Sequence, residues 1–338
     1  MKIAIPAAIG VATLLAIPMM LQWERPPMDS AQQGFRGTGM VQIDNPRMVA
    51  VKKAANVAPE PSDQAETGGP KASEIYENVQ VLGDLNEAQF TRLMLAITEW
   101  VSPEEGCNYC HNPENLAEDS VYTKVVARKM LQMTATINAQ WQPHVAETGV
   151  TCYTCHRGQP VPANVWSINP GPKQAGGMAA KRNGQNLAAA EVGVTSLPYD
   201  PFSDLLTKAQ SIRVSASTAL PTGHVSPIQD SEKTYGLMMH FSQSMGVNCT
   251  FCHNTRNFAD WSQSAPARVK AWHGIEMVNH VNKNYMDTLA DVFPDNRKGP
   301  QGDVLKTNCA TCHQGANKPL YGAQMLKDYM IELGAAKQ

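Results

Sequence analysis

The 338-residue sequence lacks three features that would each assign it to a common class: a charge imbalance, an unpaired cysteine and an abundance of histidine. The 28 Lys and Arg residues nearly balance the 30 Asp and Glu residues, and the formal net charge is −2. A chain with this charge has no basic excess for binding nucleic acid or for a polybasic contact with a membrane. With nine histidines the chain is not rich in histidine.

The eight cysteines form four C-x-x-C pairs, and each pair is followed directly by a histidine. The cysteines are Cys107, Cys110, Cys152, Cys155, Cys249, Cys252, Cys309 and Cys312, and the histidines are His111, His156, His253 and His313. C-x-x-C-H is the attachment motif of c-type haem. Two thiols three residues apart lie on one side of a helical turn, where each can add to a vinyl group of the porphyrin, and the next residue supplies an imidazole to the iron.

Disulfides and zinc are the other common uses of paired cysteines. A chain of this length does not need four disulfides to fold, and a disulfide has no use for a neighbouring histidine. Zinc takes four ligands in total and does not require a histidine after every pair. The pattern therefore predicts four covalently bound c-type haems.

The N-terminus predicts an exported, membrane-tethered protein. Lys2 precedes a 19-residue apolar stretch at 3–21, which is long enough to cross a bilayer, and Trp23 follows where an interfacial anchor would lie. A cleaved signal peptide is the alternative. The stretch is longer than the usual apolar core of a signal peptide, and no A-x-A-like cleavage site follows it. We therefore expect a retained transmembrane helix with the remaining chain on the periplasmic side.

The rest of the chain predicts a mainly α fold with few short strands. Residues 28–51 lack a clear period and 52–72 are rich in Pro, Gly and charge, so we expect extended chain followed by a loop. Apolar residues at helical spacing predict one helix from the N-cap Asn86 to Val101 and a second from about Ser120 to Ala139. A long connector containing Pro and Gly occupies about 158–200.

The haem motifs repeat in pairs. The string CNYCHN at 107–112 resembles CTFCHN at 249–254, and TCHRG at 154–158 resembles TCHQG at 311–315. This pattern indicates an internal duplication and predicts two pseudo-symmetric dihaem halves.

Four irons need four further ligands if none is left open, and Met or His is expected. Met94, Met130 and Met238 lie 17, 26 and 15 residues before the histidines of the first three motifs, on predicted helices. Methionine on an apolar helix face more often belongs to the core. Competing candidates are Met133, Met239 and Met245, and for the fourth haem the spacing leaves Met277, Met286, His273 and His280 open.

The sequence resembles the tetrahaem cytochrome c subunit of photosynthetic reaction centres of the purple-bacterial type. The resemblance covers nearly the whole chain and includes QQGFRGTGMVQIDNPR at 32–47, the uneven spacing of the four motifs and TFCHNTRNF at 250–258. It implies the axial pairs Met94 with His111, Met130 with His156, Met238 with His253, and His144 with His313. His224, His240, His273 and His280 then become surface or core histidines.

The resemblance implies an electron carrier and not an enzyme, because both axial positions of every haem are filled. The implied partners are the L, M and H subunits of the reaction centre, the light-harvesting antenna, the membrane, and a soluble cytochrome c or high-potential iron–sulfur protein as donor. Electrons would pass to the photo-oxidised bacteriochlorophyll special pair. A membrane-anchored tetrahaem quinol dehydrogenase is the alternative, but such proteins are shorter and mostly bis-His ligated. A multihaem reductase would need a haem with an open position.

The expected organisation has five parts. They are a membrane anchor at 1–23, an extended segment along the membrane subunits at 24–72, a first dihaem half at 73–160, a connector at 161–220 and a second dihaem half at 221–338.

Overall fold

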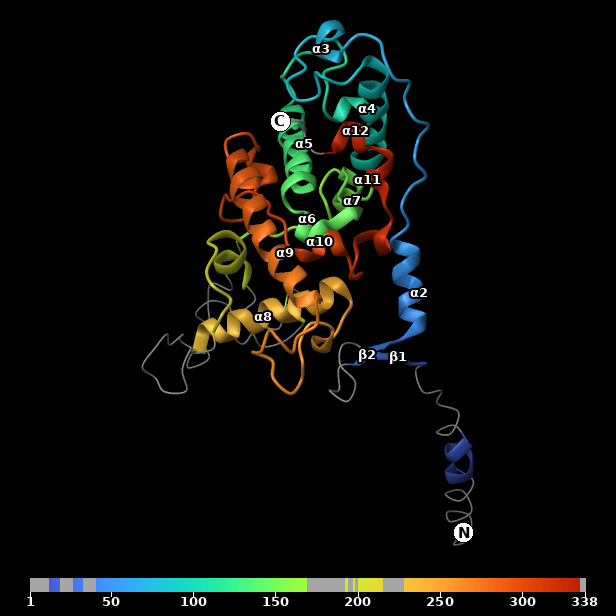
Figure 1. Cartoon of the computed structure of the whole chain (residues 1–338), viewed down its shortest axis with the longest axis vertical. Helices are drawn as coiled ribbons and strands as arrows, with labels where there is room; N and C mark the ends of the chain where they lie inside the picture. Colours follow the sequence, from blue (N-terminus) through green and yellow to red (C-terminus); the bar gives the residue numbers. More distant parts are fainter. Residues whose placement is uncertain are drawn as a thin grey trace, which may run out of the picture.

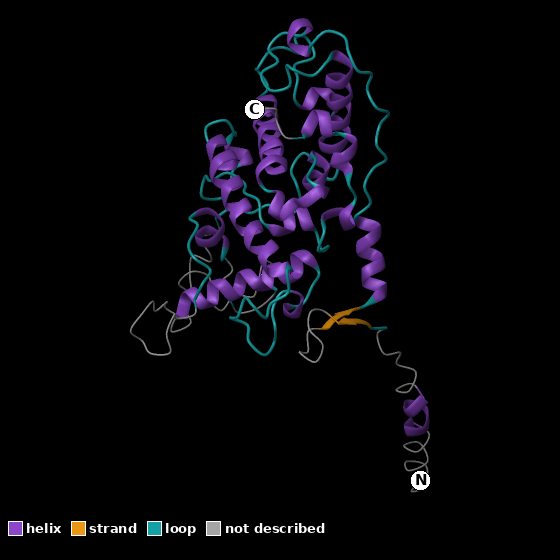
Figure 2. Cartoon of the chain, in the orientation of Figure 1, coloured by secondary structure: helices purple, strands orange, loops and turns teal. Residues whose placement is uncertain are grey.

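The computed structural model describes residues 12–18, 27–32, 41–168, 192–193, 197, 200–214 and 228–334. This part of the chain is mainly helical, as predicted, and its strands are confined to one short antiparallel pair, β1 (Asp29–Gln32) and β2 (Val41–Asp44) (Figure 2). Within the described residues no helix is long and apolar enough to cross a membrane. Most of the predicted anchor at 3–21 lies outside the described residues, and the described part, 12–18, is helical.

The helices that organise the molecule fall into two similar sets. The first set contains α4 (Glu87–Val101), α5 (Tyr122–Gln140), α6 (Gln142–Val145) and α7 (Cys152–His156). The second contains α8 (Ile228–Met245), α9 (Ala267–Val281) and α10 (Cys309–His313). Shorter elements are α2 (Pro46–Ala55), α3 (Ala72–Ile75), α11 (Met325–Asp328) and α12 (Met330–Leu333).

Short 3-10 and π segments link these helices. The 3-10 segments are η1 (Gly106–Tyr109), η2 (Ala146–Thr148), η6 (Cys249–Phe251), η8 (Asp287–Leu289), η9 (Asp295–Arg297) and η10 (Pro319–Gly322). The π segments are η5 (Ser203–Thr207) and η7 (Asn282–Met286). Of the connector part predicted at 161–220, η5 is described, and it buries Leu205 and Leu206 in the core.

Both helices predicted in the first half are present. Asn86 caps α4 because its side chain accepts a hydrogen bond from the Gln89 backbone amide, at 2.8 Å, and the Gln89 side chain accepts one from the Asn86 amide in return. The second predicted helix corresponds to α5, which begins two residues later than expected, at Tyr122.

The expectation of extended chain and loop over 28–72 was wrong for α2. Asn45 caps this helix by accepting a hydrogen bond from the Arg47 amide, Pro46 occupies its first turn, and Lys52 and Lys53 lie in its last turn. No residue of α2 is buried, so the segment carries no apolar period from which a helix could have been predicted. Local capping specifies this helix.

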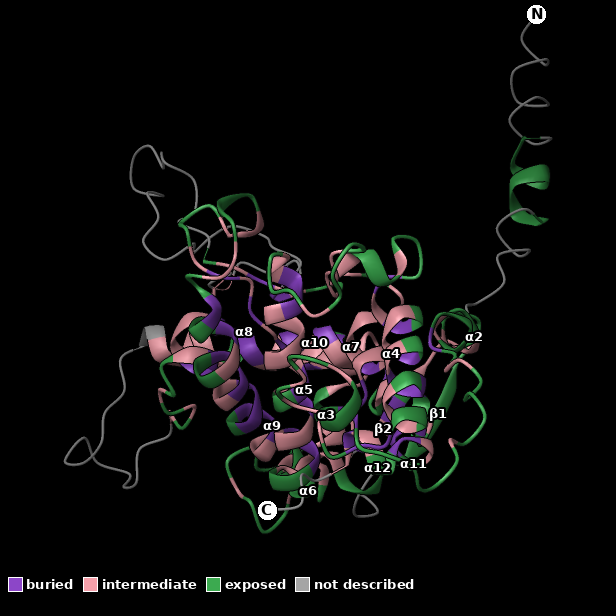
Figure 3. Cartoon of the chain, turned by 90° about the horizontal axis from the view of Figure 1, so that it is seen from above, coloured by how far each residue is buried: buried purple, intermediate pink, exposed green. Residues whose placement is uncertain are grey.

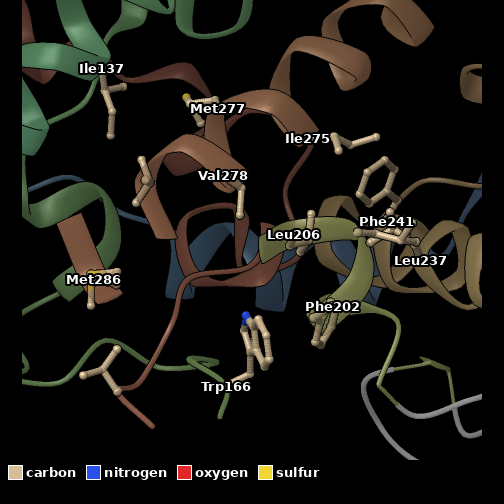
Figure 4. Packing of buried hydrophobic residues seen from close by; sticks show 13 residues of the cluster. Ile137, Trp166, Phe202, Leu206, Leu237, Phe241, Ile275, Met277, Val278 and Met286 are labelled. Atoms are coloured by element: carbon tan, nitrogen blue, oxygen red, sulfur yellow. The ribbon is translucent and has the colours of Figure 1, made fainter. Parts of the chain in front are cut away.

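Two apolar clusters form the interior, and α5 contributes to both, through Ile137 to one and through Leu131 to the other. One cluster joins α8, α9, η5 and η7 (Figure 4), with Leu237 and Phe241 on α8 and Val278 on α9 among its members. The other joins α4 to the C-terminal helices through Leu93, Trp100, Tyr329 and other residues. Figure 3 shows buried residues on α4 and α8, whereas α2 carries only exposed and intermediate residues.

A buried ion pair fastens the C-terminal end of the chain to α4. The Arg92 guanidinium donates to the Glu332 carboxylate at 2.8 Å, and the two side chains are 6% and 4% exposed. Arg92 also donates to the backbone carbonyl oxygens of Asp63 and Ser62, and its guanidinium stacks on the Tyr329 ring at 4.0 Å. The guanidinium therefore connects three distant segments of the chain.

Removing the Arg92 charge is expected to destabilise the protein strongly. In Arg92→Met the Glu332 carboxylate stays buried without its partner, which costs about 3–5 kcal/mol of unfolding free energy. Denaturant unfolding of the holoprotein measures the loss. The double variant Arg92→Met/Glu332→Gln should lose less, and Lys71→Met, which removes the exposed Lys71–Asp84 pair, should change little. An Arg92→Met protein as stable as the wild type would contradict this account.

Candidate haem-binding sites

The four C-x-x-C-H motifs lie in two kinds of local structure. The first and third motifs are built on the 3-10 turns η1 and η6, and the second and fourth form the short α-helices α7 and α10. In each motif the thiols and the histidine come from about one helical turn, as the sequence predicted. Among the described residues, no group of three or more His, Cys, Asp or Glu side chains is placed to hold a bare metal ion.

The second and fourth motifs have the same local fold. In each helix the hydroxyl of the third residue accepts a hydrogen bond from the backbone amide of the N-cap residue. The Thr154 hydroxyl accepts from the Thr151 amide at 2.9 Å, and the Thr311 hydroxyl accepts from the Asn308 amide at 3.0 Å. Both helices end on a left-handed residue after the histidine, with φ of 52° at Arg157 and 46° at Gln314. This left-handed cap turns the chain away directly after the imidazole.

Each of these two helices is attached to the larger helix beside it by an equivalent hydrogen bond. The Gly158 amide donates to the Trp100 carbonyl of α4 at 2.8 Å, and the Gly315 amide donates to the Ser244 carbonyl of α8 at 2.7 Å. The acceptors lie six residues after Met94 and Met238 respectively. The two sets of helices therefore repeat the same packing. The repetition seen in the motif strings is also present in the hydrogen bonds that attach the motif helices.

The motifs follow one another in the order first, second, fourth, third. The turn η1 contacts α4, α4 packs on α7, α7 packs on α10, and α10 packs on α8, which leads directly into η6. Figure 1 shows α4, α7, α10 and α8 in this sequence along the long axis of the molecule. The spatial order differs from the chain order because the second and fourth motifs meet at the centre.

At this centre the two motif helices are cross-linked through side chains. The Arg157 guanidinium donates to the Cys312 carbonyl at 3.3 Å, and the Gln314 amide donates to the Cys155 carbonyl at 3.4 Å. The sulfur atoms of Cys155 and Cys312 are joined in a disulfide, with the two Cα atoms 4.4 Å apart. One sulfur cannot form a disulfide and a thioether together, so the disulfide and haem attachment at these cysteines are alternative states.

Each motif histidine has its Nδ1 atom paired with a backbone carbonyl oxygen. In the first and third motifs the partner lies five residues on, at Leu116 for His111 and Phe258 for His253, at 2.9 and 3.0 Å. In the second and fourth it lies three residues on, at Gln159 for His156 and Ala316 for His313, at 2.8 and 2.9 Å.

A carbonyl oxygen can only accept, so Nδ1 carries the proton in all four rings. The Nε2 lone pair is then available to a metal, and the ring is held in one orientation. This is the tautomer that haem ligation requires.

Burial keeps most of these imidazoles neutral. Desolvation lowers the pKa of His156, of His253 and of His144, and it lowers the pKa of His313 to about 4. A neutral imidazole is the form that binds a metal. Desolvation likewise raises the pKa of the Cys252 thiol to about 11 and of the Cys152 and Cys309 thiols to about 12, and it raises that of Cys110.

The structure brings His144 and His313 together although they are far apart in the sequence. Their ring centroids are 6.1 Å apart. Two metal–imidazole bonds of about 2 Å each, plus roughly 1 Å from each nitrogen to its ring centre, give about 6 Å. The separation therefore fits one iron between the two rings.

The backbone around His144 is built to receive its ring. Nδ1 of His144 pairs with the Lys270 carbonyl of α9 at 2.8 Å, as the motif histidines pair with their own carbonyls. A Cβ atom at Gly274, one turn further along α9, would lie 2.6 Å from Cε1 of His144. Glycine at this position leaves the space that the imidazole occupies.

Sequence reasoning missed Gly274 and the five carbonyl partners. A glycine inside a helix costs about 1 kcal/mol relative to alanine, which is a signal that the position needs a close approach. The sequence does not say which group approaches. The carbonyl oxygens carry no side-chain signal at all.

The three methionines predicted as ligands are half-buried on the expected helices. Met94 lies on α4 and packs against one apolar cluster, and Met130 on α5 and Met238 on α8 pack against the other. The competitors Met133 and Met245 also pack against a cluster, and Met277 and Met286 are core members. The pairing of Met94, Met130 and Met238 with particular histidines stays a prediction.

The remaining histidines have other partners. Nδ1 of His273 lies 3.5 Å from the Glu276 carboxylate, and His280 contacts Asn284 and the Trp141 ring. His240 is buried, with its Nε2 atom 3.1 Å from the Ser244 hydroxyl. His224 lies outside the described residues.

Comparison with known proteins identifies the family of this chain. The sequence model of the family described as "Photosynthetic reaction centre cytochrome C subunit" matches residues 24–332. The photosynthetic reaction center cytochrome c subunit of Rubrivivax gelatinosus is 53% identical over 97% of this chain and 90% of its own length. Those of Thermochromatium tepidum and Roseobacter denitrificans are 51% and 41% identical, over 97% and 96% of this chain and 80% and 89% of their own lengths. The chain therefore belongs to the family of photosynthetic reaction centre cytochrome c subunits.

Proposed function

We propose that this protein is the electron-transfer subunit of a photosynthetic reaction centre. It carries four covalent c-type haems and passes electrons from a soluble periplasmic donor to the photo-oxidised bacteriochlorophyll special pair. Family membership supports the role, since the relatives are named as reaction centre cytochrome c subunits. The observation that supports the bis-His pair is the 6.1 Å separation of the His144 and His313 rings.

The eight cysteines would hold the haems through thioether bonds. Each C-x-x-C pair supplies two thiols and each following histidine an imidazole whose Nδ1 is already bonded to a carbonyl. The haem supplies an iron that gains and loses one electron. Attachment at the second and fourth motifs uses Cys155 and Cys312 as free thiols, so a chain with all four haems attached would not contain the Cys155–Cys312 disulfide.

The second axial ligands would be Met94, Met130, Met238 and His144. They give three Met/His sites, with His111, His156 and His253, and one bis-His site, with His313. With these eight residues as ligands, no position would remain at the irons for a substrate, as expected for an electron carrier. Because Met/His ligation raises a haem potential relative to bis-His, the haem of His144 and His313 should have a lower potential than the others.

The packing order of the motifs supports a single row of haems. The first motif lies at one end, beside α4, and the third at the other, beyond α8. We propose two dihaem halves at 73–160 and 221–338, separated by a connector at 161–220. The third motif would face the special pair, and the soluble cytochrome c or high-potential iron–sulfur protein would act as donor.

The proposed setting is the periplasmic side of the photosynthetic membrane. An N-terminal helix at 1–23 would anchor the chain, and 24–72 would run along the membrane subunits. The exposed apolar side chains of Met48 and Val51 on α2 and Ile43 on β2 are consistent with such a contact, because a solvated segment gains nothing from them. The L, M and H subunits and the antenna are the expected neighbours.

Intact-mass and peptide mapping of the purified holoprotein test the haem attachment. We expect a mass increase equal to four haems, with all eight cysteines present as thioethers. A peptide in which the second and fourth motifs are joined by the Cys155–Cys312 disulfide, with fewer than four haems bound, would contradict the proposal.

A potentiometric titration followed in the α band and by low-temperature EPR tests the ligand set. Three higher-potential haems with Met/His signatures and one lower bis-His haem are expected. Four low-potential bis-His haems would instead favour a quinol dehydrogenase, and a high-spin five-coordinate haem would indicate an enzyme.

The variant Gly274→Ala tests the bis-His site. The new Cβ would lie 2.6 Å from Cε1 of His144, so the ring must move and the bis-His EPR signal should shift or disappear while the three Met/His signals persist. Val269→Ala changes a half-exposed residue of the same helix and serves as the control. An unchanged bis-His signal in Gly274→Ala would show that His144 does not ligate there.

A further inference from the structure

The carbonyl oxygen of Leu116 accepts hydrogen bonds from two side chains at once. Nδ1 of His111 lies 2.9 Å from it, and the Lys124 ammonium lies 2.8 Å from it. Lys124 is on the first turn of α5 and is only 8% exposed. The lysine therefore places a positive charge beside the hydrogen bond that orients the histidine of the first motif.

The neighbouring groups hold the ammonium in this position. Its Nζ atom also donates to the Glu118 carbonyl at 2.9 Å and lies 3.3 Å from the Asp119 carboxylate. Asp119 receives two hydrogen bonds from the Arg128 guanidinium, both at 2.8 Å. The hydrogen bond from Arg128, the largest favourable contribution, helps to lower the pKa of Asp119 to about 2.

One carboxylate thus faces two cations, Lys124 and Arg128. These three side chains together carry one net positive charge, and the Glu118 carboxylate accepts a hydrogen bond from the Asn112 amide beside the first motif. Because Asp119 also pairs with Arg128, its single negative charge does not fully neutralise the Lys124 ammonium.

The arrangement differs from that of the other ligand histidines. Their Nδ1 atoms pair with the carbonyl oxygens of Gln159, Phe258, Ala316 and Lys270. Among the hydrogen bonds of the described residues, a lysine ammonium donates to the shared oxygen only at Leu116.

Two physical effects of Lys124 act in the same direction. An oxygen that already accepts from an ammonium is a weaker acceptor for the His111 N–H, so the imidazole gains less electron density to give to the iron. A nearby positive charge in a poorly solvated site also disfavours the oxidised iron, which carries one more positive charge than the reduced iron. Both effects favour the reduced state.

We propose that Lys124 is a positioning residue that raises the reduction potential of the haem held by Cys107, Cys110 and His111. The proposal rests on the proposed function, since it assumes haem at the first motif. Lys124 is not one of the proposed ligands, and its charge would raise the reduction potential of one of the four haems. The first haem lies at the end of the row away from the third motif, so Lys124 would tune one end of the row independently of the centre.

The test is a redox titration of the holoprotein with Lys124→Gln and Lys124→Met. We expect one potential to shift downward, more in Lys124→Met because glutamine still offers an N–H to Leu116, with the other three unchanged and the EPR spectrum still low-spin. The haem is identified as the one whose potential also moves in Met94→His. Asp119→Asn, which removes the negative charge beside Lys124, should shift the same potential upward.

Lys129→Gln is the matched control. Lys129 is on the same helix, and its ammonium lies over the Tyr285 ring, 5.2 Å from the centroid, so its loss should leave all four potentials in place. If all four potentials are unmoved in Lys124→Gln and Lys124→Met while ligation is intact, the proposal is wrong. A high-spin haem in Lys124→Met with no shift in Lys124→Gln would also overturn it and assign the lysine a purely structural role.

Failure of the proposed function has a different signature. A wild-type protein without haem at the first motif, or without any Met/His haem, would remove the basis of the function itself. The variants at 124 are interpreted only against a wild-type titration that shows four haems.

Discussion

The contact between α7 and α10 is the constraint on which the arrangement of the molecule depends. Both helices are five residues long and carry a complete motif, so the backbones of the second and fourth motifs meet directly. Arg157 and Gln314 each extend a side chain to a cysteine carbonyl of the opposite motif. Each helix is then tied to α4 or α8 through one glycine amide. These attachments place the first motif at one end and the third at the other.

The second requirement is the tautomer of the histidines that are predicted as ligands. Five imidazoles, from the four motifs and His144, use a backbone carbonyl oxygen as the partner of Nδ1. A backbone acceptor is fixed by the turn after the motif, and its hydrogen bond does not depend on a flexible side chain. The lowered pKa of His313, about 4, reflects the same burial that protects the site from water. The motif therefore specifies the ligand, and the following turn specifies its orientation.

The haem motifs and two of the main helices could be predicted from the sequence, whereas helix α2 and the role of Gly274 could not. The C-x-x-C-H strings identify the motifs because covalent attachment needs two thiols and an imidazole within one turn. Helices α4 and α5 were predictable because each buries one apolar face, whereas α2 buries none and was missed. The proximity of His144 to His313 came from family resemblance, since no local pattern links residues 169 positions apart. A glycine inside a helix, such as Gly274, indicates that another group comes close to the backbone, but the sequence does not say which group.

The sequence by itself determined the number of haem motifs, the protein class and the two-fold repetition of the motif strings. Those features are encoded over a few consecutive residues, where covalent chemistry and helical geometry leave little freedom. Tertiary structure decided the spatial order of the motifs, the space at Gly274 that receives the His144 ring, and the sharing of the Leu116 carbonyl between His111 and Lys124. The first two depend on how helices from distant parts of the chain pack together, and the third on the turn between the first motif and α5, which no motif string or apolar period specifies.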